Sequence, residues 1–167
     1  MKKSWIIIAA VLLLAGCSAQ GSLETVTDVY GEQPLSPAKQ IVLELPQEVA
    51  VPAMQSKEAG TLYLCEDYTV TVQTGEVGDL NATLREATGF EKEQLALVET
   101  VRGELACYEC AWSSAGEAEQ QVGRAVVLDD GSYHYVVTVM ADASQAGALQ
   151  KTWQALFDSM YLTDTAP

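Results

Sequence analysis

The segment 124–139 constrains the fold of this chain more than any other. Two runs rich in β-branched and aromatic residues, 124–128 and 133–139, flank the tetrapeptide Asp-Asp-Gly-Ser at 129–132. Aspartate followed by glycine supplies the positive φ that a tight turn between two twisted strands requires. The segment therefore predicts an antiparallel β-hairpin.

Five more runs have the length and the β-branched or alternating character of strands. These runs are 41–45, 61–65, 68–74, 95–101 and 104–112. Pro46 ends the first of them, because proline cannot donate to a strand ladder. The polar segment 113–121 is expected to form a loop in solvent.

Two amphipathic segments predict helices. The first follows Asp79, which can cap its first turn, and ends at Gly89, a residue suited to a left-handed terminator. The second begins after a cap at Asp142 or Ser144. Its apolar positions are three and four residues apart, so one face must lie against a sheet; they are Ala146, Leu149, Trp153, Leu156 and Met160.

The order of these elements indicates the fold class. Three strands precede the short helix, four follow it, and the long helix closes the chain. This order predicts an α+β fold, in which an antiparallel sheet of about six or seven strands is flanked by the two helices.

Four features follow one another between residues 40 and 163. They are a helix that ends in Gly89-Phe90, a strand that ends in Ala111-Trp112, the hairpin Val-Leu-Asp-Asp-Gly-x-Tyr-x-Tyr at 127–135 and the pattern Trp-x-x-Leu-Phe-x-Ser at 153–159. This series resembles small bacterial lipoproteins of the PsbP-like α/β/α sandwich group. The resemblance implies a single sandwich domain over 40–163, of a group whose members mostly bind or assist other macromolecules, and it implies no shared active site.

The amino terminus has the form of a signal peptide. Two lysines precede an uncharged apolar run at 5–14, which is about half as long as a membrane-spanning helix needs to be. The run ends in Leu-Ala-Gly-Cys at 14–17, which resembles the lipobox of bacterial lipoproteins in all four positions. The resemblance implies cleavage between Gly16 and Cys17 and the attachment of diacylglycerol, with acyl chains such as palmitate, to the Cys17 sulfur.

These features predict a lipid-anchored protein on the extracytoplasmic face of the cell membrane, or of the outer membrane if the organism has two membranes. Residues 1–16 would be the signal peptide, 17–39 the lipidated terminus and a flexible tether, and 164–167 a tail. The alternative is an ordinary secretory signal that happens to contain a cysteine.

The net charge excludes one class of partner. Nine Lys and Arg against 23 Asp and Glu give a formal charge of -14 at pH 7. This charge repels the phosphate backbone of nucleic acids and the head groups of anionic lipids. We therefore expect no nucleic-acid partner, and we expect the lipid on Cys17 alone to hold the protein at the membrane.

His134 is the only histidine, and it falls within the predicted strand 133–139. A catalytic triad would need a nucleophile and an orienting group brought to it from elsewhere in the chain, which has no Gly-x-Ser-x-Gly elbow. The acidic residues are dispersed and lack the spacing of a calcium loop. We expect no catalytic residue, no metal site and no cofactor.

Cys107 and Cys110 have the C-x-x-C spacing of a redox pair. In a strand, however, residues three apart face opposite sides and lie about 10 Å apart, which is too far for a disulfide. Redox pairs of this spacing usually begin a helix, which lowers the thiol pKa. Cys110 shares its strand face with Tyr108 and Trp112, so we expect it to be a small buried apolar residue. A disulfide from Cys65 to Cys107 or Cys110 remains open.

Aromatic residues in the predicted strands have two possible roles. They could line a groove for glycan or peptide, but in alternating strands they more often pack in the core. These residues are Tyr63, Tyr68, Tyr108, Trp112, Tyr133 and Tyr135.

The sequence thus predicts a non-catalytic binding or assembly module that is anchored outside the cytoplasm. Its expected partner, besides the membrane, is an envelope protein or a cell-wall component. Two alternatives remain: a thiol-dependent redox helper that uses Cys107 and Cys110, and a receptor for a small ligand or glycan.

Overall fold

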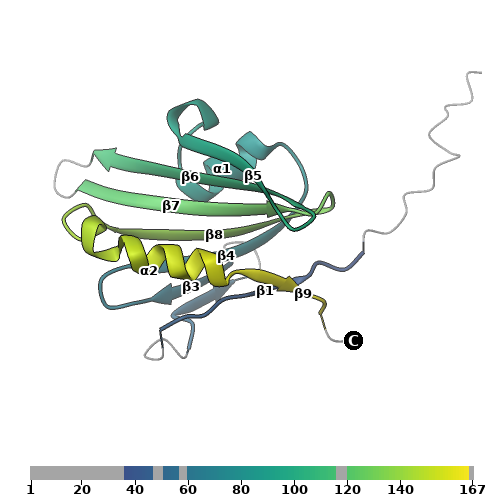
Figure 1. The fold of residues 1–167 in the computed structure, drawn as a ribbon, viewed down its shortest axis with the longest axis horizontal. Helices are drawn as coiled ribbons and strands as arrows, with labels where there is room; N and C mark the ends of the chain where they lie inside the picture. The colour runs from purple at the N-terminus through teal and green to yellow at the C-terminus, as the bar shows by residue number, and fades with distance from the viewer. Residues whose placement is uncertain (1–35, 47–50, 57–59, 116–119, 166–167) are drawn as a thin grey trace, which may run out of the picture. The chain divides into compact units, whose positions relative to one another are not determined.

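The computed structural model describes residues 36–46, 51–56, 60–115 and 120–165. The fold is α+β, as predicted, and is built on a seven-stranded antiparallel sheet of order β2-β3-β4-β8-β7-β6-β5 (Figure 1). The strands of this sheet are β2 (Met54–Ser56), β3 (Gly60–Leu64), β4 (Thr69–Glu76), β5 (Ala96–Arg102), β6 (Leu105–Ala115), β7 (Gln120–Asp129) and β8 (Tyr133–Asp142).

The predicted hairpin β7–β8 lies at the centre of the sheet. Its turn contains Gly131 at φ 85°, and the Gly131 N–H donates to the carboxylate of Asp129 at 2.7 Å. Val126 of β7 pairs with Val137 of β8, and both side chains are fully buried. The local turn signal and the burial of β-branched side chains therefore agree on one register.

The helix α2 (Ala146–Ser159) covers one face of the sheet. Its buried residues are Leu149, Trp153, Leu156 and Phe157, and they pack in a core with Val126, Val137 and Val139. The prediction that Asp142 or Ser144 caps this helix is wrong. Gln145 is the N-cap, and its side chain makes no capping hydrogen bond. Asp142 and Ser144 lie in a turn before the helix, in which the Asp142 carbonyl accepts from the Gln145 N–H at 2.9 Å.

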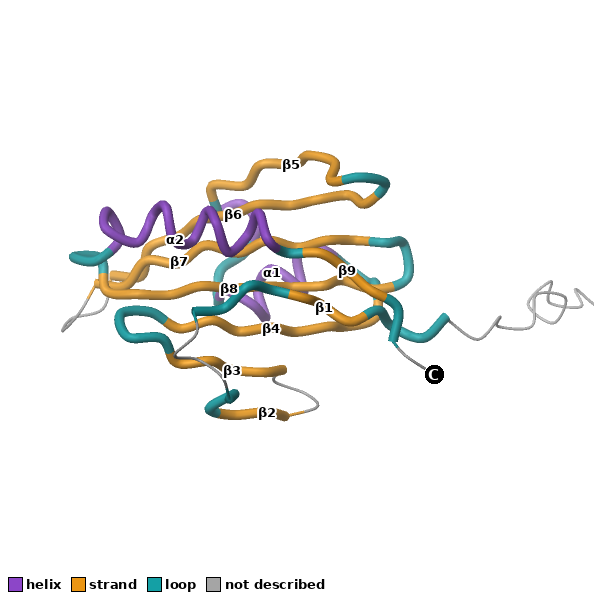
Figure 2. The backbone as a smooth tube through the Cα atoms, turned by 60° about the horizontal axis from the view of Figure 1, so that its bottom comes forward, coloured by secondary structure: helices purple, strands orange, loops and turns teal. Residues whose placement is uncertain are grey.

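The helix α1 (Leu80–Thr88) covers the opposite face. As predicted, Asp79 caps it by accepting from the Asn81 N–H at 3.1 Å, and Gly89 ends it at φ 80°. Leu84 is fully buried in a second core with Cys110 and Val127. Figure 2 shows the two helices on opposite sides of the sheet, which gives the α/β/α sandwich.

The prediction for 41–45 is half right. This part of the chain forms the strand β1 (Gln40–Val42), but β1 is outside the large sheet. It pairs with the unpredicted strand β9 (Tyr161–Thr163), and the two lie side by side next to the end of α2 (Figure 1). The first and last strands of the described residues thus pair with each other.

The prediction of a loop at 113–121 is wrong in its extent. The strand β6 continues to Ala115 and β7 begins at Gln120, with Ser113 opposite Val122. Residues 116–119 lie outside the described part. No helix among the described residues has both the length and the apolar composition to cross a membrane.

Candidate functional site

The residues predicted to carry the lipid lie outside the part of the chain that the structure describes. Gly16 and Cys17 precede residue 36, where the described chain begins. The cleavage site and the lipid on Cys17 therefore stay predictions from sequence.

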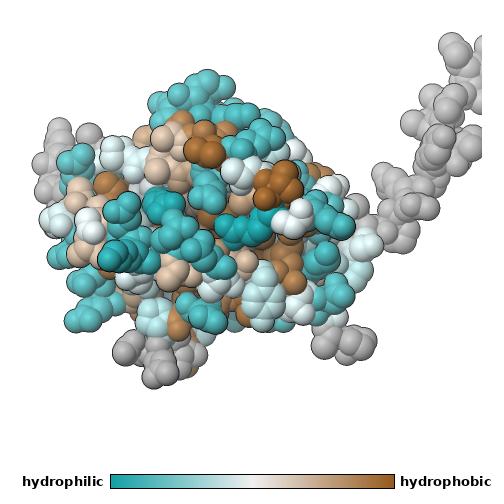
Figure 3. All heavy atoms as spheres, viewed as in Figure 1, coloured by the Kyte–Doolittle hydropathy of each residue, from teal (hydrophilic) through white to brown (hydrophobic). Residues whose placement is uncertain are grey.

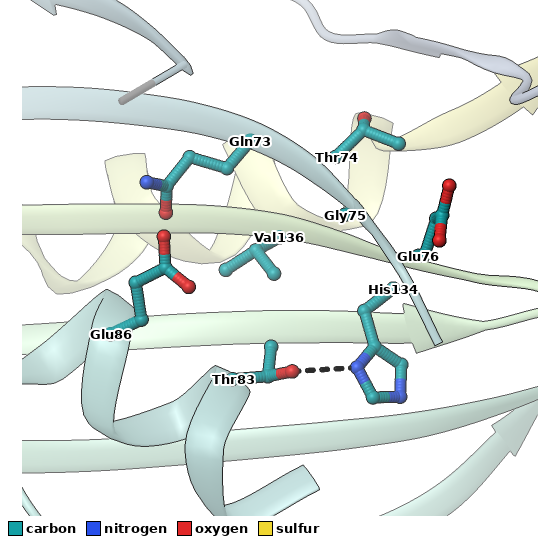
Figure 4. Close-up of a pocket in the computed structure, with 8 residues that line it drawn as sticks. All are labelled: Gln73, Thr74, Gly75, Glu76, Thr83, Glu86, His134 and Val136. Carbon is teal, nitrogen blue, oxygen red and sulfur yellow. Dashed lines mark hydrogen bonds between the residues drawn. The ribbon is translucent and has the colours of Figure 1, made fainter. Parts of the chain in front are cut away.

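His134 lies at the junction of β8 and α1, and only 2% of its surface is exposed. Its Nδ1 and the Thr83 Oγ1 of α1 are hydrogen-bonded at 2.7 Å, as Figure 4 shows. On the other side of the ring, Nε2 is 3.7 Å from a carboxylate oxygen of Asp129. The fold thus places a hydroxyl and a carboxylate beside the only histidine, a grouping that the sequence did not indicate.

This grouping has the residue types of a catalytic triad but not its geometry. In a triad, the acid holds the second ring nitrogen by a hydrogen bond, which fixes the tautomer and aims the ring. The 3.7 Å separation at Asp129 is longer than a hydrogen bond, and the same carboxylate already accepts from the Gly131 N–H. The arrangement instead gives the buried imidazole a hydrogen-bond partner and fastens α1 to the sheet.

A small pocket of about 100 Å³ lies beside His134. Figure 4 shows Glu76 of β4 and Glu86 of α1 on either side of it. Both glutamates are exposed. The pocket is about the volume of a few water molecules, so it lacks room for an organic substrate.

The cysteines do not form a redox site. Cys65, Cys107 and Cys110 are all free thiols. Cys107 packs in the core under α2 and Cys110 in the core under α1, on opposite faces of β6 as predicted. Burial raises the pKa of Cys110 to about 11, so its thiol is protonated and unreactive at neutral pH.

Cys65 does not bridge to either of the other two. It follows β3, which is separated from β6 by β4, β8 and β7 in the sheet, a distance of about 19 Å at the usual strand spacing. Burial also raises the pKa of the Cys65 thiol. Within the described ranges, no group of three or more His, Cys, Asp or Glu side chains could hold a metal ion.

A larger groove of about 560 Å³ runs between α2 and the strands β6 and β7. Arg124 lies in its floor, and Gln150 and Gln154 of α2 are on its wall. Small residues leave the space open; they are Ala111, Ala146 and Gly147. These side chains give the groove hydrogen-bonding groups around a shallow hollow.

The Arg124 guanidinium is held in place by two contacts. It stands 5.4 Å from the centroid of the Phe157 ring, and its Nη2 is 3.8 Å from Glu109. Glu109 also lies 3.6 Å from Arg102, whose Nη1 donates to the Phe157 carbonyl at 2.7 Å. The two arginines thus fix the last turn of α2 to β5, β6 and β7.

The six aromatic residues do not line one groove. Tyr68 and Tyr135 are buried with α2, together with the partly buried Tyr63 and Tyr133, whereas Tyr108 and Trp112 pack on the α1 face. The interpretation of these residues as core is therefore correct. Trp112 fits flat against the backbone of Gly123, where an added Cβ would be 2.3 Å from the indole.

The comparisons with known proteins show a similarity of fold, without a match in sequence to a family model or a curated protein. Among solved structures, LpqN of Mycobacterium tuberculosis, described as involved in cell envelope biogenesis, aligns over 77% of this chain and 86% of its own. The TM-score is 0.53 at 12% identity.

This chain shares its fold with LpqN. Two further structures are similar at lower scores. CyanoP, the PsbP protein of Synechocystis sp. PCC 6803, has a TM-score of 0.49 at 9% identity and covers 81% of this chain and 99% of its own. A protein of Bacteroides thetaiotaomicron has a TM-score of 0.48 at 11% identity, and the match covers 78% of this chain and 50% of that one.

Proposed function

We propose that this protein is a lipoprotein, anchored through Cys17 outside the cytoplasm, whose domain binds or helps to assemble a component of the cell envelope without catalysing a reaction. The observation that carries the proposal is the pattern Leu-Ala-Gly-Cys at 14–17, directly after a short apolar run. A run of this length suits a cleaved signal, and the lipid then replaces it as the anchor.

Two observations support the envelope role. LpqN, which has a similar fold, is described as involved in cell envelope biogenesis. In the described domain, the potentially reactive side chains have structural roles. His134 is hydrogen-bonded to Thr83, and Cys107 and Cys110 are buried. These contacts favour a binding module over the redox alternative.

The charge of the domain supports an anchor that does not depend on the protein surface. At a formal charge of -14, the chain is repelled by anionic head groups within the Debye length. Acyl chains stabilise membrane attachment by about 0.8 kcal/mol for each buried methylene, and two or more chains make the attachment lasting.

The test is membrane fractionation of Cys17→Ser with Cys65→Ser as the matched control. We expect Cys17→Ser to leave the membrane fraction or to keep its signal peptide. We expect Cys65→Ser to remain membrane-bound, with an acylated amino-terminal peptide in its mass spectrum. If Cys17→Ser were processed normally and still sedimented with the envelope, the lipid-anchor proposal would be wrong.

The groove beside α2 favours a second candidate function, a receptor for a small polar ligand or glycan. Its volume of about 560 Å³ lies within the range of ligand sites. Thermal-shift measurements with fragments of cell-wall glycan test this candidate. Gly147→Trp, which fills the groove, should abolish any stabilisation by a fragment, whereas Ala148→Trp, one residue outside the lining, should not.

A further inference from the structure

The strand β5 forms one edge of the large sheet (Figure 2). Within the described residues it pairs only with β6, and the register runs without interruption from Ala96 opposite Ala111 to Arg102 opposite Leu105. In the described part of the chain, one side of this seven-residue strand thus carries backbone groups with no strand beside them.

The hairpin geometry shows which backbone groups face outward. Only Gly103 and Glu104 separate Arg102 from Leu105, so these two form a hydrogen-bonded pair at the end of a two-residue loop. Hydrogen-bonded and non-hydrogen-bonded pairs alternate along an antiparallel ladder. The N–H and C=O groups of Leu97, Glu99 and Val101 therefore point away from β6, toward the open edge.

The exposed side chains on β5 are unusually apolar for such an edge. Val98 is 58% exposed and Val101 is 74% exposed, and they lie on opposite faces of the strand. Figure 3 shows hydrophobic atoms at the surface over β5. A neighbouring strand would cover apolar surface on both faces at once.

Proteins usually protect an edge strand with proline, lysine, a bulge or short length. The segment Ala-Leu-Val-Glu-Thr-Val-Arg at 96–102 has no proline and no lysine, and its unbroken register leaves no bulge. The opposite edge, β2, is protected by its length of three residues. Among the described residues, the sheet therefore has one edge protected by its short length and one long edge whose protection is limited to the charges of Glu99 and Arg102.

We propose that β5 is a docking strand that adds an extended segment of a partner protein to the sheet. Main-chain hydrogen bonds to Leu97, Glu99 and Val101 would supply the affinity, and apolar side chains on the two faces of the partner strand would cover Val98 and Val101. This inference identifies the partner surface of the proposed binding module, but it does not depend on the lipid at Cys17.

Charge selects the kind of segment that fits. Glu99 and Glu104 lie at this edge, and the whole chain carries a formal charge of -14. A second copy of the chain would bring the same charge to the interface, so self-pairing is disfavoured. The occupant is an uncharged or basic segment with apolar residues on both faces of the strand.

The probe is a capped peptide as long as β5, in which valines lie on both faces of the strand and lysines supply positive charge, added to the mature protein in detergent. Hydrogen exchange measured by mass spectrometry should show slower exchange in the β5 segment when the peptide binds. The same peptide with glutamate in place of lysine should give no such protection, because its charge opposes that of the edge.

Glu99→Pro removes one outward N–H and leaves the ladder to β6 intact, since proline is tolerated on the open side of an edge strand. Glu99→Ala, the matched control, removes the same charge and keeps the N–H. We expect Glu99→Pro to bind the lysine peptide at least about tenfold more weakly than Glu99→Ala, which corresponds to about 1.4 kcal/mol.

Val101→Lys provides a second variant that leaves the backbone unchanged. A lysine at this exposed edge position should also weaken binding of the lysine peptide. Exchange in β8, at the centre of the sheet, reports whether each variant is folded.

Three results would overturn the inference. They are equal binding by Glu99→Pro and Glu99→Ala, protection located away from β5, and a wild-type dimer that Glu99→Pro dissociates, which would make a second copy the occupant. Fractionation of Cys17→Ser is independent of these outcomes, so failure at β5 and failure of the anchor are distinguishable.

Discussion

Tyr135 donates a hydrogen bond from its hydroxyl to the carboxylate of Asp130 at 2.9 Å. The same hydroxyl accepts from the Lys39 N–H at 3.0 Å, across 96 residues of sequence. Tyr135 is fully buried. Burial, together with the hydrogen bond to Asp130, raises the pKa of Tyr135 to about 12. One hydroxyl therefore joins the turn of the central hairpin to the residue that precedes β1.

The first prediction removes that hydroxyl. Tyr135→Phe keeps the ring in the core but leaves the Lys39 N–H without its acceptor and Asp130 without its donor. We expect a loss of about 1–2 kcal/mol in the free energy of unfolding, measured by urea denaturation. Tyr161→Phe, at an exposed residue, is the control and should leave the free energy unchanged. Equal stability of wild type and Tyr135→Phe would contradict the role given to this hydroxyl.

The second prediction concerns the pH dependence of stability at Asp130. Burial acts to raise the pKa of Asp130, but hydrogen bonds from the Ser132 and Tyr133 N–H groups and from the Tyr135 hydroxyl outweigh it and hold the pKa below its usual value. A group with a lowered pKa in the folded state stabilises the protein above its unfolded pKa of about 3.9. That contribution is lost as the pH falls through the folded pKa.

Asp130→Asn should therefore be less stable than wild type at neutral pH, by about 1–3 kcal/mol. The difference between the two proteins should shrink as the pH is lowered below about 4. Denaturation curves at a series of pH values measure this difference. A gap that stays constant down to strongly acidic pH would show that Asp130 is not held as the carboxylate.

The third prediction compares two glycines. At Gly123 a Cβ would be 2.3 Å from the Trp112 indole, whereas at Gly147 of α2 no atom beyond the adjacent residues and the local helix backbone lies within 4 Å of the Cβ position. Gly123→Ala should destabilise the protein by about 1–3 kcal/mol because the core has no space for the methyl group. Gly147→Ala should stabilise it by about 0.5–1 kcal/mol because alanine is the better helix former. Thermal unfolding distinguishes the two signs, and the same sign for both variants would contradict the packing.

The parts of the fold that follow from local sequence signals were predictable. Asp79 and Gly89 mark the ends of α1, and the turn at 129–132 fixes the central hairpin, since in each case the side chains and glycines act on their own backbone. The pairing of Gln40 with Thr163 was not predictable. Each of these two strands, the first and the last of the described residues, has only three residues and so no periodicity to detect, and its stability comes from tertiary contacts.

The contact at His134 was missed for a related reason. Thr83 and His134 are 51 residues apart, and neither position carries a signal of the other. The prediction that His134 falls within a strand was correct, but it gave no indication of the partner. The polar stretch at 113–121 was misassigned because strand pairing continues where alternation of apolar residues stops.

The fourth prediction concerns thiol reactivity. Cys107 is fully buried and Cys110 is 2% exposed, so neither should react with a thiol reagent in the native protein, whereas the half-buried Cys65 should react slowly. Unfolding in denaturant should expose all three thiols to the reagent. Treatment with a reductant should change neither the native thiol count nor the stability. A pair of thiols that appears only after reduction would restore the redox alternative.

The fifth prediction tests whether the hydrogen bond between Thr83 and His134 stabilises the fold. Thr83→Val and His134→Leu each remove one side of the contact, and each leaves the other side without its partner in a buried site. Each single variant should lose about 1–3 kcal/mol of unfolding free energy. The double variant should lose less than the sum of the two, with a coupling of about 1 kcal/mol. Hydrogen exchange should become faster in α1 than in α2, because Thr83 is on α1. Additive losses, with exchange unchanged in α1, would mean that apolar packing by residues such as Leu84 holds the helix without this hydrogen bond.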